Sequence, residues 1–343
     1  MDNAETIVVV CGCDENYAMP LAVTLRSAVD HLAMDRALQV YIFDGGIRCE
    51  SKQRIEESCC EDRVSIEFVT IDMSILKDVP VSEHVNAASY LRLLIPDVLP
   101  RSIGRVIYLD SDLLVCKDLS ELWEMPLGEN AILAAQDSAA PYLDSSIATS
   151  NFSLCARYLA APRPIANYES LEMSPYAKYF NAGVLVIDVD HWRRERLDEE
   201  LFACLDQHRA HVLWWDQYAL NVVMYGRWGE LDMRWNQTAH LFAYPAHGES
   251  PFRKRSMALL RKDPWIIHFT SSLKPWNYFC RHPETKRFHH YLSRTSWAGY
   301  TAERPDDYLQ QIWKYHSDAA RNGIRRRKRM IRRFLGTEHR RAG

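Results

Sequence analysis

Short, uninterrupted apolar segments alternate with amphipathic segments along the first half of the chain, and this alternation constrains the fold more than any other feature. The segments "TIVVVCG" (6–12), "LQVYIFD" (38–44) and "RVIYLD" (105–110) do not alternate between apolar and polar residues. Strands of this kind are buried on both faces, as in a parallel sheet covered by helices. Residues 20–32 carry apolar side chains at helical spacing, so we expect an α/β fold with a mostly parallel sheet.

Acidic residues mark the ends of several expected strands. Asp14, Asp44, Asp110 and Asp137 each follow such an apolar segment. In an open α/β sheet, ligands bind beyond the carboxyl ends of the strands, so these carboxylates are expected along the edge of a ligand site. The apolar pattern returns after residues 139–178, a segment with four prolines that we expect to form a loop-rich insertion.

Asp110 and Asp112 flank a single serine in "YLDSDLLV" (108–115), directly after an expected buried strand. Two carboxylates at this spacing repel each other, and burying either one alone is costly. A divalent cation or a shared proton would relieve the conflict, whereas a solvated turn would avoid it. The D-x-D sequence by itself does not distinguish these states.

Two enzyme classes use such a pair of aspartates. A haloacid-dehalogenase-type phosphatase is disfavoured, because at least three α/β units precede the motif and Leu114 stands where that class usually has Thr or Val. A nucleotide-sugar transferase uses the aspartates to hold Mn²⁺ or Mg²⁺ against a diphosphate. The segment "HFTSSLKPW" (268–276) favours the transferase, since His268 would complete the metal site and Lys274 would neutralise phosphate. An imidazole ligand favours Mn²⁺ over Mg²⁺.

Charge is distributed unevenly along the chain, whose formal net charge is −3. Residues 321–343 contain ten Lys or Arg and one Glu, so their net charge is +9. Residues 1–320 contain the other 32 basic and 44 acidic side chains, so their net charge is −12. An acidic body of this kind would repel nucleic acid. The basic tail is therefore expected to bind an anionic membrane surface instead.

Several features predict a cytoplasmic protein. The chain has no apolar stretch of about 18 residues, so no membrane span is expected, and its N-terminus does not resemble a secretory signal. The nine cysteines are odd in number and mostly lie among apolar residues, as is typical of reduced thiols. The sequons at Asn151 and Asn236 are therefore expected to be unmodified.

Four segments, in this order and spacing, resemble glycosyltransferase family 8: "YLDSDLLV", "YFNAGVLVID", "WWDQYALN" and "HFTSSLKPW". The resemblance runs from about Thr6 to Trp276. It implies a single Rossmann-like nucleotide-sugar-binding domain of the GT-A type. It also implies retaining transfer of glucose or galactose from a UDP-sugar to a hydroxyl of a glycan or glycolipid acceptor, as in lipopolysaccharide synthesis.

The same resemblance implies roles for individual residues. The Mn²⁺ ligands would be Asp110, Asp112 and His268, with Mg²⁺ as the alternative ion. The other implied contacts are with uridine (Asp14, Asn16, Tyr17), the acceptor (His84), the donor sugar and phosphates (Arg92, Asp137, Asn181, Asp216, Gln217) and the diphosphate (Lys274). Ser271 stands where the family commonly has glycine, and a side chain there would disturb a backbone that closely approaches phosphate.

Arg92, Asp216 and Gln217 are the expected catalytic residues within this set. The acceptor would attack from the face that UDP leaves, and a phosphate oxygen would take its proton. Because an amide is a poor nucleophile, Gln217 is expected to stabilise and position the sugar. The competing hypothesis is a catalytically idle glycan- or nucleotide-binding protein on the same fold.

Residues 1–282 are expected to form the catalytic domain and residues 283–343 a helical extension. Five apolar side chains recur at spacings of three, four and seven among the arginines of the tail: Ile324, Met330, Ile331, Phe334 and Leu335. On a helix they would form a narrow stripe between basic flanks, which suits a membrane interface. This predicts a peripheral protein at the inner face of the membrane, with a disordered solubilising tail as the alternative.

Overall fold

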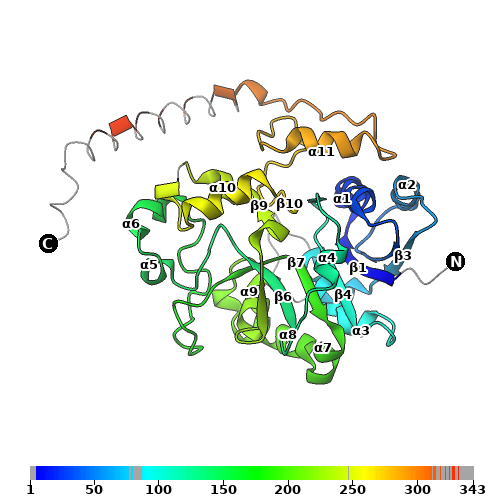
Figure 1. Cartoon of the computed structure of the whole chain (residues 1–343), viewed down its shortest axis with the longest axis horizontal. Coiled ribbons are helices and arrows are strands. Elements are labelled where there is room, and N and C mark those ends of the chain that lie inside the picture. The colour runs from blue at the N-terminus through cyan, green and yellow to red at the C-terminus, as the bar shows by residue number, and fades with distance from the viewer. Residues whose placement is uncertain are drawn as a thin grey trace. The chain divides into compact units, whose positions relative to one another are not determined.

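The computed structural model describes residues 5–76, 79, 87–245 and 247–310, and, further along, 312, 313, 317, 321, 324, 327, 328 and 331. A seven-stranded sheet with the order β3-β2-β1-β4-β7-β6-β8 forms its centre (Figure 1). The strands are β1 (Glu5–Cys13), β2 (Arg36–Asp44), β3 (Val64–Thr70), β4 (Arg105–Leu109), β6 (Ile132–Gln136), β7 (Phe180–Asp188) and β8 (Trp228–Leu231). Only β7 among these runs antiparallel to its neighbours β4 and β6. The expected α/β fold with a mainly parallel sheet is confirmed.

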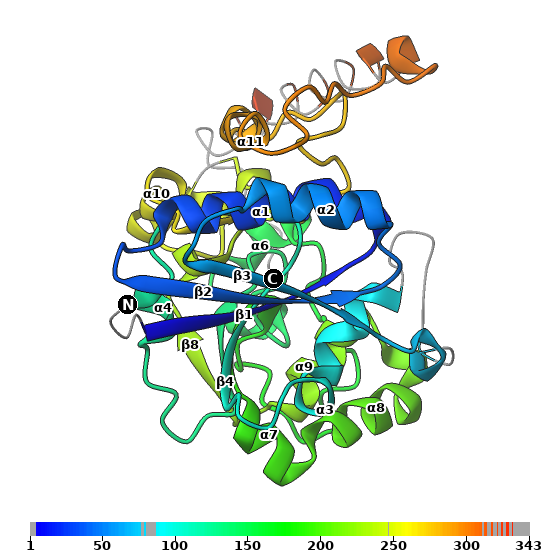
Figure 2. The ribbon, with the colours of Figure 1, turned by 90° about the vertical axis from the view of Figure 1, so that its right-hand side faces the viewer.

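Helices cover both faces of the sheet, which explains why the strand sequences do not alternate in polarity. Figure 2 shows α1 (Ala18–His31) and α2 (Cys49–Ser58) on one side of β1 to β3, and α3 (Ile95–Val98), α7 (Val189–Glu195) and α8 (Leu197–Gln207) on the other. Along β1, Ile7 and Val9 belong to the apolar core beneath α1, whereas Val8 and Val10 belong to the opposite core.

Before β4, a 3₁₀ helix, η3 (Ala87–Leu94), runs directly into α3. The expected insertion 139–178 contains the short helices α5 (Ser145–Ala148), α6 (Phe152–Cys155) and η4 (Ala156–Tyr158) and is otherwise irregular. The remaining elements are η1 (Glu15–Tyr17), η2 (Met73–Leu76), α4 (Ser120–Trp123), η5 (Arg209–His211), α9 (Asp216–Val223), η6 (Met233–Asn236), η7 (Ala239–Ala243), η8 (His247–Glu249), α10 (Lys254–Lys262) and α11 (Thr285–Leu292).

A second, three-stranded sheet lies beyond the end of β4. It contains β5 (Leu113–Val115), β10 (Ile266–His268) and β9 (Gln237–Thr238), with β10 in the middle. On the side of β5 away from β10, hydroxyls of α1 replace a strand partner: Thr24 Oγ1 accepts from the Leu113 N–H (3.0 Å) and Ser27 Oγ accepts from the Val115 N–H (2.9 Å). Helix α1 therefore fixes the strand that follows the D-x-D turn.

The chain divides into two compact units, residues 1–276 with 280–300, and residues 277–279 with 301–343. Within the second unit, the rings of Tyr278 and Phe279 meet Tyr308 edge-on, with ring centres 5.2 and 5.7 Å apart. The boundary predicted at residue 282 stays a prediction, and most of the basic tail lies outside the described residues. Across the described parts of both units, no helix combines the length and apolar character needed to cross a membrane.

The cysteines and sequons can be compared directly with their predictions. All nine cysteines are free thiols, and five of them are buried: Cys11, Cys13, Cys59, Cys155 and Cys204. Asn236 is only 1% exposed, so its sequon is inaccessible to a modifying enzyme in the folded protein.

Replacing Thr24 with valine should lower the free energy of unfolding by about 1–3 kcal/mol, because the buried Leu113 N–H loses its acceptor while the side-chain shape is retained. Denaturant unfolding would measure this loss. Thr24→Ser is the matched control, since it retains the hydroxyl. Equal stability of the valine and serine variants would contradict the proposed anchoring of β5 by α1.

Candidate active site

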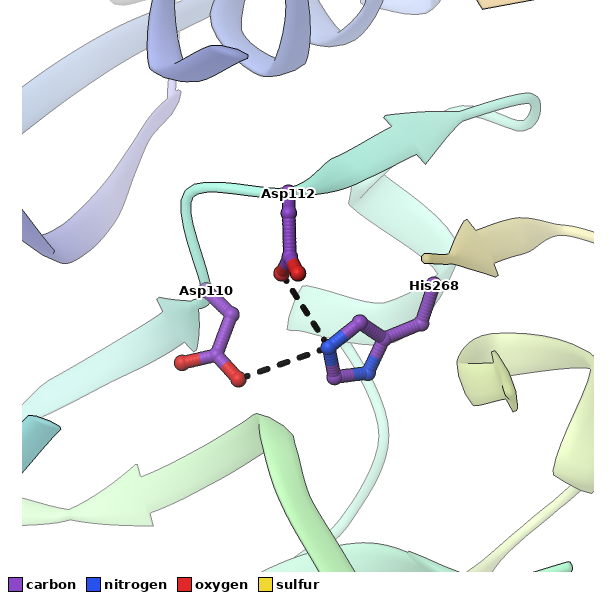
Figure 3. Close-up of side chains that lie close together, drawn as sticks. All are labelled: Asp110, Asp112 and His268. Carbon is purple, nitrogen blue, oxygen red and sulfur yellow. Dashed lines mark ion pairs between the residues drawn. The ribbon is translucent and has the colours of Figure 1, made fainter. Parts of the chain in front are cut away.

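Two short strands and one turn bring the three expected metal ligands together (Figure 3). Asp110 follows β4, Asp112 precedes β5, and His268 ends β10, where it pairs with Leu113 in the antiparallel register. The Nε2 atom of His268 lies 3.5 Å from Asp110 Oδ2 and 3.2 Å from Asp112 Oδ1. One potential ligand atom from each of the three residues lies within 4.8 Å of the others.

The backbone beside this cluster is shaped to leave room for it. The register of β7 against β6 shifts here: Leu185 pairs with Ala134 but Asn181 with Ala135, so β7 bulges at the site. The carbonyl of Gly183, within the bulge, accepts from the Asp110 N–H (2.9 Å). A Cβ at Gly183 would lie only 2.2 Å from His268 Cε1 and 2.7 Å from Asp110 Oδ2. The space against the ligands thus depends on glycine, and two carboxylates with one imidazole fit a divalent cation such as Mn²⁺.

Basic side chains compensate both aspartates. Lys274 Nζ lies 2.6 Å from Asp112 Oδ2 and donates to the carbonyl of Phe269 (2.6 Å). Burial alone would raise the pKa of Asp112, but Lys274 and His268 outweigh it and hold that pKa well below its usual range. Asp112 is therefore a carboxylate over the whole physiological pH range.

Arg92 lies between the metal cluster and a second buried carboxylate. Its guanidinium is 2.9 Å from Asp110 Oδ1 and 2.9 Å from Asp216 Oδ2, and it stacks 4.5 Å from the ring centre of Tyr108. Burial opposes its charge, but Asp110 and Asp216 prevail and raise the pKa of Arg92. The Nε–H of Arg92 donates to the carbonyl of Ser89. Burial dominates at Asp216 and raises its pKa to about 6 despite the arginine.

Two amides and a carboxylate form a connected cluster at the end of β6. Asn181 Nδ2 and Gln217 Nε2 both donate to Asp137 Oδ2, at 3.0 and 3.2 Å. The Oε1 atom of Gln217 accepts from the Ala182 N–H (3.1 Å) and from Asn181 Nδ2 (3.1 Å). Because a carbonyl oxygen has two lone pairs, this oxygen is fully engaged in positioning.

The backbone that leads into this cluster has a rare conformation. Trp214 and Trp215 have φ angles of 61° and 52°, and Trp215 immediately precedes Asp216 at the start of α9. Non-glycine residues in such regions cost about 1–3 kcal/mol each and persist where the surroundings enforce them. The sequence predicted Asp216 and Gln217 as site residues but gave no sign of this conformation.

The expected uridine site begins where β1 ends. Asp14 Oδ1 accepts from the N–H of Tyr17 (3.1 Å), which fixes the turn of η1. The ring of Tyr17 meets Trp276 edge-on at 5.8 Å, and the ammonium of Lys274 lies 5.9 Å from the Tyr17 ring centre. Asn16 is exposed beside this turn.

A cavity of about 560 Å³ connects these groups and falls in the size range of small-molecule sites. Twelve of the predicted site residues line it: Asp14, Tyr17, Arg92, Asp110, Asp112, Asp137, Asn181, Asp216, Gln217, His268, Ser271 and Lys274. Asn16 does not line the cavity, and His84 lies outside the described residues. Lining residues to which the sequence assigned no role include Trp214, Trp215, Thr238 and His240.

Comparison with known proteins decides the family. The model of "Glycosyl transferase family 8" matches residues 8–280. The chain belongs to glycosyl transferase family 8. The resemblance to this family that the sequence showed is therefore confirmed.

Relatives of this family 8 chain cover most of its length. General stress protein A of Bacillus subtilis (strain 168) is 29% identical over 300 residues, which span 87% of this chain and 96% of that protein. Lipopolysaccharide 1,2-glucosyltransferase of Escherichia coli (strain K12) is 23% identical over 301 residues, 87% of this chain and 80% of the relative.

Solved structures show the same fold. The galactosyltransferase LgtC, crystallised with donor and acceptor sugar analogs, superimposes with a TM-score of 0.70 at 22% identity, covering 89% of this chain and 99% of that one. The architecture is the GT-A fold.

Replacing Gly183 with alanine should weaken Mn²⁺ binding by about 100-fold, because the new methyl group must displace His268 or Asp110. Electron paramagnetic resonance of free Mn²⁺ would measure the affinity, and circular dichroism would confirm the fold. Gly248→Ala is the control, since a Cβ there meets nothing within 4 Å. Unchanged affinity in Gly183→Ala would contradict the placement of the metal against β7.

Proposed function

We propose that this family 8 member is a Mn²⁺-dependent retaining hexosyltransferase that moves glucose or galactose from a UDP-sugar to a hydroxyl of a lipopolysaccharide or another surface glycan. The observation that carries the proposal is the convergence of Asp110, Asp112 and His268 with Lys274 in one cavity. The names of the relatives support a hexose donor, since they include a lipopolysaccharide glucosyltransferase and a galactosyltransferase.

Charge complementarity supports a diphosphate ligand at the metal end of the cavity. Asp110, Asp112 and His268 would hold Mn²⁺, which when bound neutralises charge on the departing nucleotide diphosphate. Lys274 is held within the same cluster, where it would bind phosphate oxygens. Tyr17, the last residue of η1, presents an aromatic ring beside Lys274 that would stack on uracil.

The hydrogen bonds of Gln217 support a retaining reaction without a covalent glycosyl-enzyme. Both lone pairs of its Oε1 atom accept hydrogen bonds from Ala182 and Asn181, so this oxygen would not attack the anomeric carbon. The acceptor hydroxyl would instead attack from the face that the phosphate leaves, and a phosphate oxygen would take its proton. Arg92, Asp216 and Asp137 would orient the sugar beside this path.

The idle binding protein remains the second candidate because of Ser271. Its backbone does not have a positive φ, so glycine is not needed there for conformational reasons. The exposed hydroxyl of Ser271 donates to the carbonyl of Leu273 (2.8 Å). The turn therefore accommodates serine without backbone strain, and Ser271 alone does not argue against the enzyme.

Purified protein should hydrolyse UDP-glucose or UDP-galactose slowly in the presence of Mn²⁺, and this hydrolysis should stop when a chelator removes the metal. Asp112→Asn should abolish hydrolysis, because the variant loses a metal ligand, while its thermal unfolding stays cooperative. Proton NMR of a transfer product should show an α-linkage. A β-linked product would refute the retaining mechanism, and hydrolysis that persists in chelator would refute the metal site.

We also propose that the C-terminal unit binds an anionic membrane surface. Four apolar side chains of this unit are highly exposed, from 56% to 71%: Leu309, Trp313, Ile324 and Ile331. Ile324 and Ile331 lie seven residues apart among basic residues, a spacing that suits one face of an interfacial helix. Each Lys or Arg near an anionic leaflet adds about 1 kcal/mol of attraction. We therefore place the enzyme at the inner face of the cytoplasmic membrane, close to a glycolipid acceptor.

Deleting residues 321–343 should release the protein from anionic vesicles at moderate salt, because the +9 segment is lost. Hydrolysis of soluble UDP-sugar should be unaffected, since the cavity is lined by residues before 275. Vesicle co-sedimentation measures the binding, and neutral vesicles serve as the control. Equal binding of the truncated and full-length proteins would remove the membrane role.

A further inference from the structure

His268 makes a second contact, on the side of its ring that faces away from the aspartates. Its Nδ1 atom lies 2.9 Å from Asn236 Oδ1, and both residues are almost fully buried. A neutral imidazole carries its proton on one nitrogen and a lone pair on the other. Nε2 faces Asp110 and Asp112, whereas Nδ1 faces Asn236. The end of the Asn236 amide that faces Nδ1 therefore decides whether the neutral ring has its lone pair on Nε2.

Groups with only one hydrogen-bonding role settle the orientation of the amides. The backbone N–H of Gly183 can only donate, and it lies 3.0 Å from Asn181 Oδ1. At the other end, the carboxylate of Asp137 accepts from Asn181 Nδ2 (3.0 Å). The two ends of the Asn181 amide are thus assigned by a fixed donor and by a fixed acceptor.

Asn181 in turn orients Asn236. The atom of Asn236 that lies 2.8 Å from Asn181 Oδ1 must be a donor, so it is Nδ2. The remaining Oδ1 atom of Asn236 then faces His268 and can only accept. Nδ1 of the imidazole therefore carries a proton. When the ring is neutral, as a cation ligand must be, its lone pair is on Nε2, which faces the two aspartates.

We propose that Asn236 is a positioning residue of the metal site, which holds His268 in the tautomer and ring orientation that a cation ligand requires. The inference rests on the proposed function only for the presence of the metal. Histidine ligands generally donate their second N–H to an acceptor of this kind, and loss of that acceptor weakens metal binding by about 10–100-fold. The same chain of amides continues through Asn181 to Gln217, so one network orients the metal ligand and the sugar end of the cavity.

The local fold explains why an asparagine can reach this point. Asn236 ends η6 and leads into β9, which runs parallel to β10 with Thr238 beside His268. The ring of Trp235 packs against Trp265, with ring centres 4.9 Å apart, and fixes this turn in the core. Gln237, the next residue, is equally buried but donates to the carbonyl of Leu260 instead.

The test is the affinity of the full-length protein for Mn²⁺ alone, measured by electron paramagnetic resonance at one fixed pH without nucleotide. Asn236→Ala should weaken binding by about 10–100-fold. Asn236→Asp retains the acceptor opposite Nδ1 but loses the donor to Asn181 Oδ1, so it should recover part of the affinity that Asn236→Ala loses. Gln237→Ala is the matched control: it removes a neighbouring buried amide and should leave Mn²⁺ affinity unchanged. If Asn236→Ala does not fold, Asn236→Leu retains the volume without the acceptor.

Three outcomes would overturn the inference: wild-type affinity in Asn236→Ala or Asn236→Leu, an equal loss in Gln237→Ala, or a loss in Asn236→Asp as large as in Asn236→Ala. Absence of Mn²⁺ binding in the wild-type protein would instead refute the proposed metal-dependent function. The two failures are therefore distinguishable.

Discussion

The repulsion between Asp110 and Asp112 is the constraint on which the rest of this structure depends. Two carboxylates at the end of a buried strand are stable only with compensating charge. Arg92 pairs with the first, Lys274 with the second, and His268 lies between them. These partners come from two distant parts of the chain, η3 and the segment that begins at the end of β10, so the site is complete only in the folded domain.

The order of the strands explains how the compensation is achieved. Strands β1 and β4 are parallel neighbours, so Asp14 and Asp110 emerge at one edge of the sheet. The antiparallel β7 brings Gly183 to that edge, and the small sheet around β10 brings His268. A sheet of parallel strands alone would have supplied only the acidic half of the site.

The sequence predicted what depends on local pattern and missed what depends on packing. Apolar runs identified the strands, and motif spacing identified twelve of the residues that line the cavity. The bulge at Gly183, the positive φ of Trp214 and Trp215, and the contact between Asn236 and His268 were not predicted. Each arises from a register or an approach between distant segments, and no local propensity encodes it. The apolar run of β7 also did not reveal its antiparallel direction, because burial on both faces produces the same run in either direction.

Binding of UDP to the protein, measured by calorimetry with and without Mn²⁺, tests the central claim most directly. If the aspartates, His268 and Lys274 form a cation-dependent diphosphate site, UDP should bind in Mn²⁺ and lose most of its affinity in chelator, since two carboxylates would then repel the phosphates. Equal UDP affinity in chelator and in Mn²⁺ would contradict the assignment of this cluster as a metal-dependent nucleotide-sugar site.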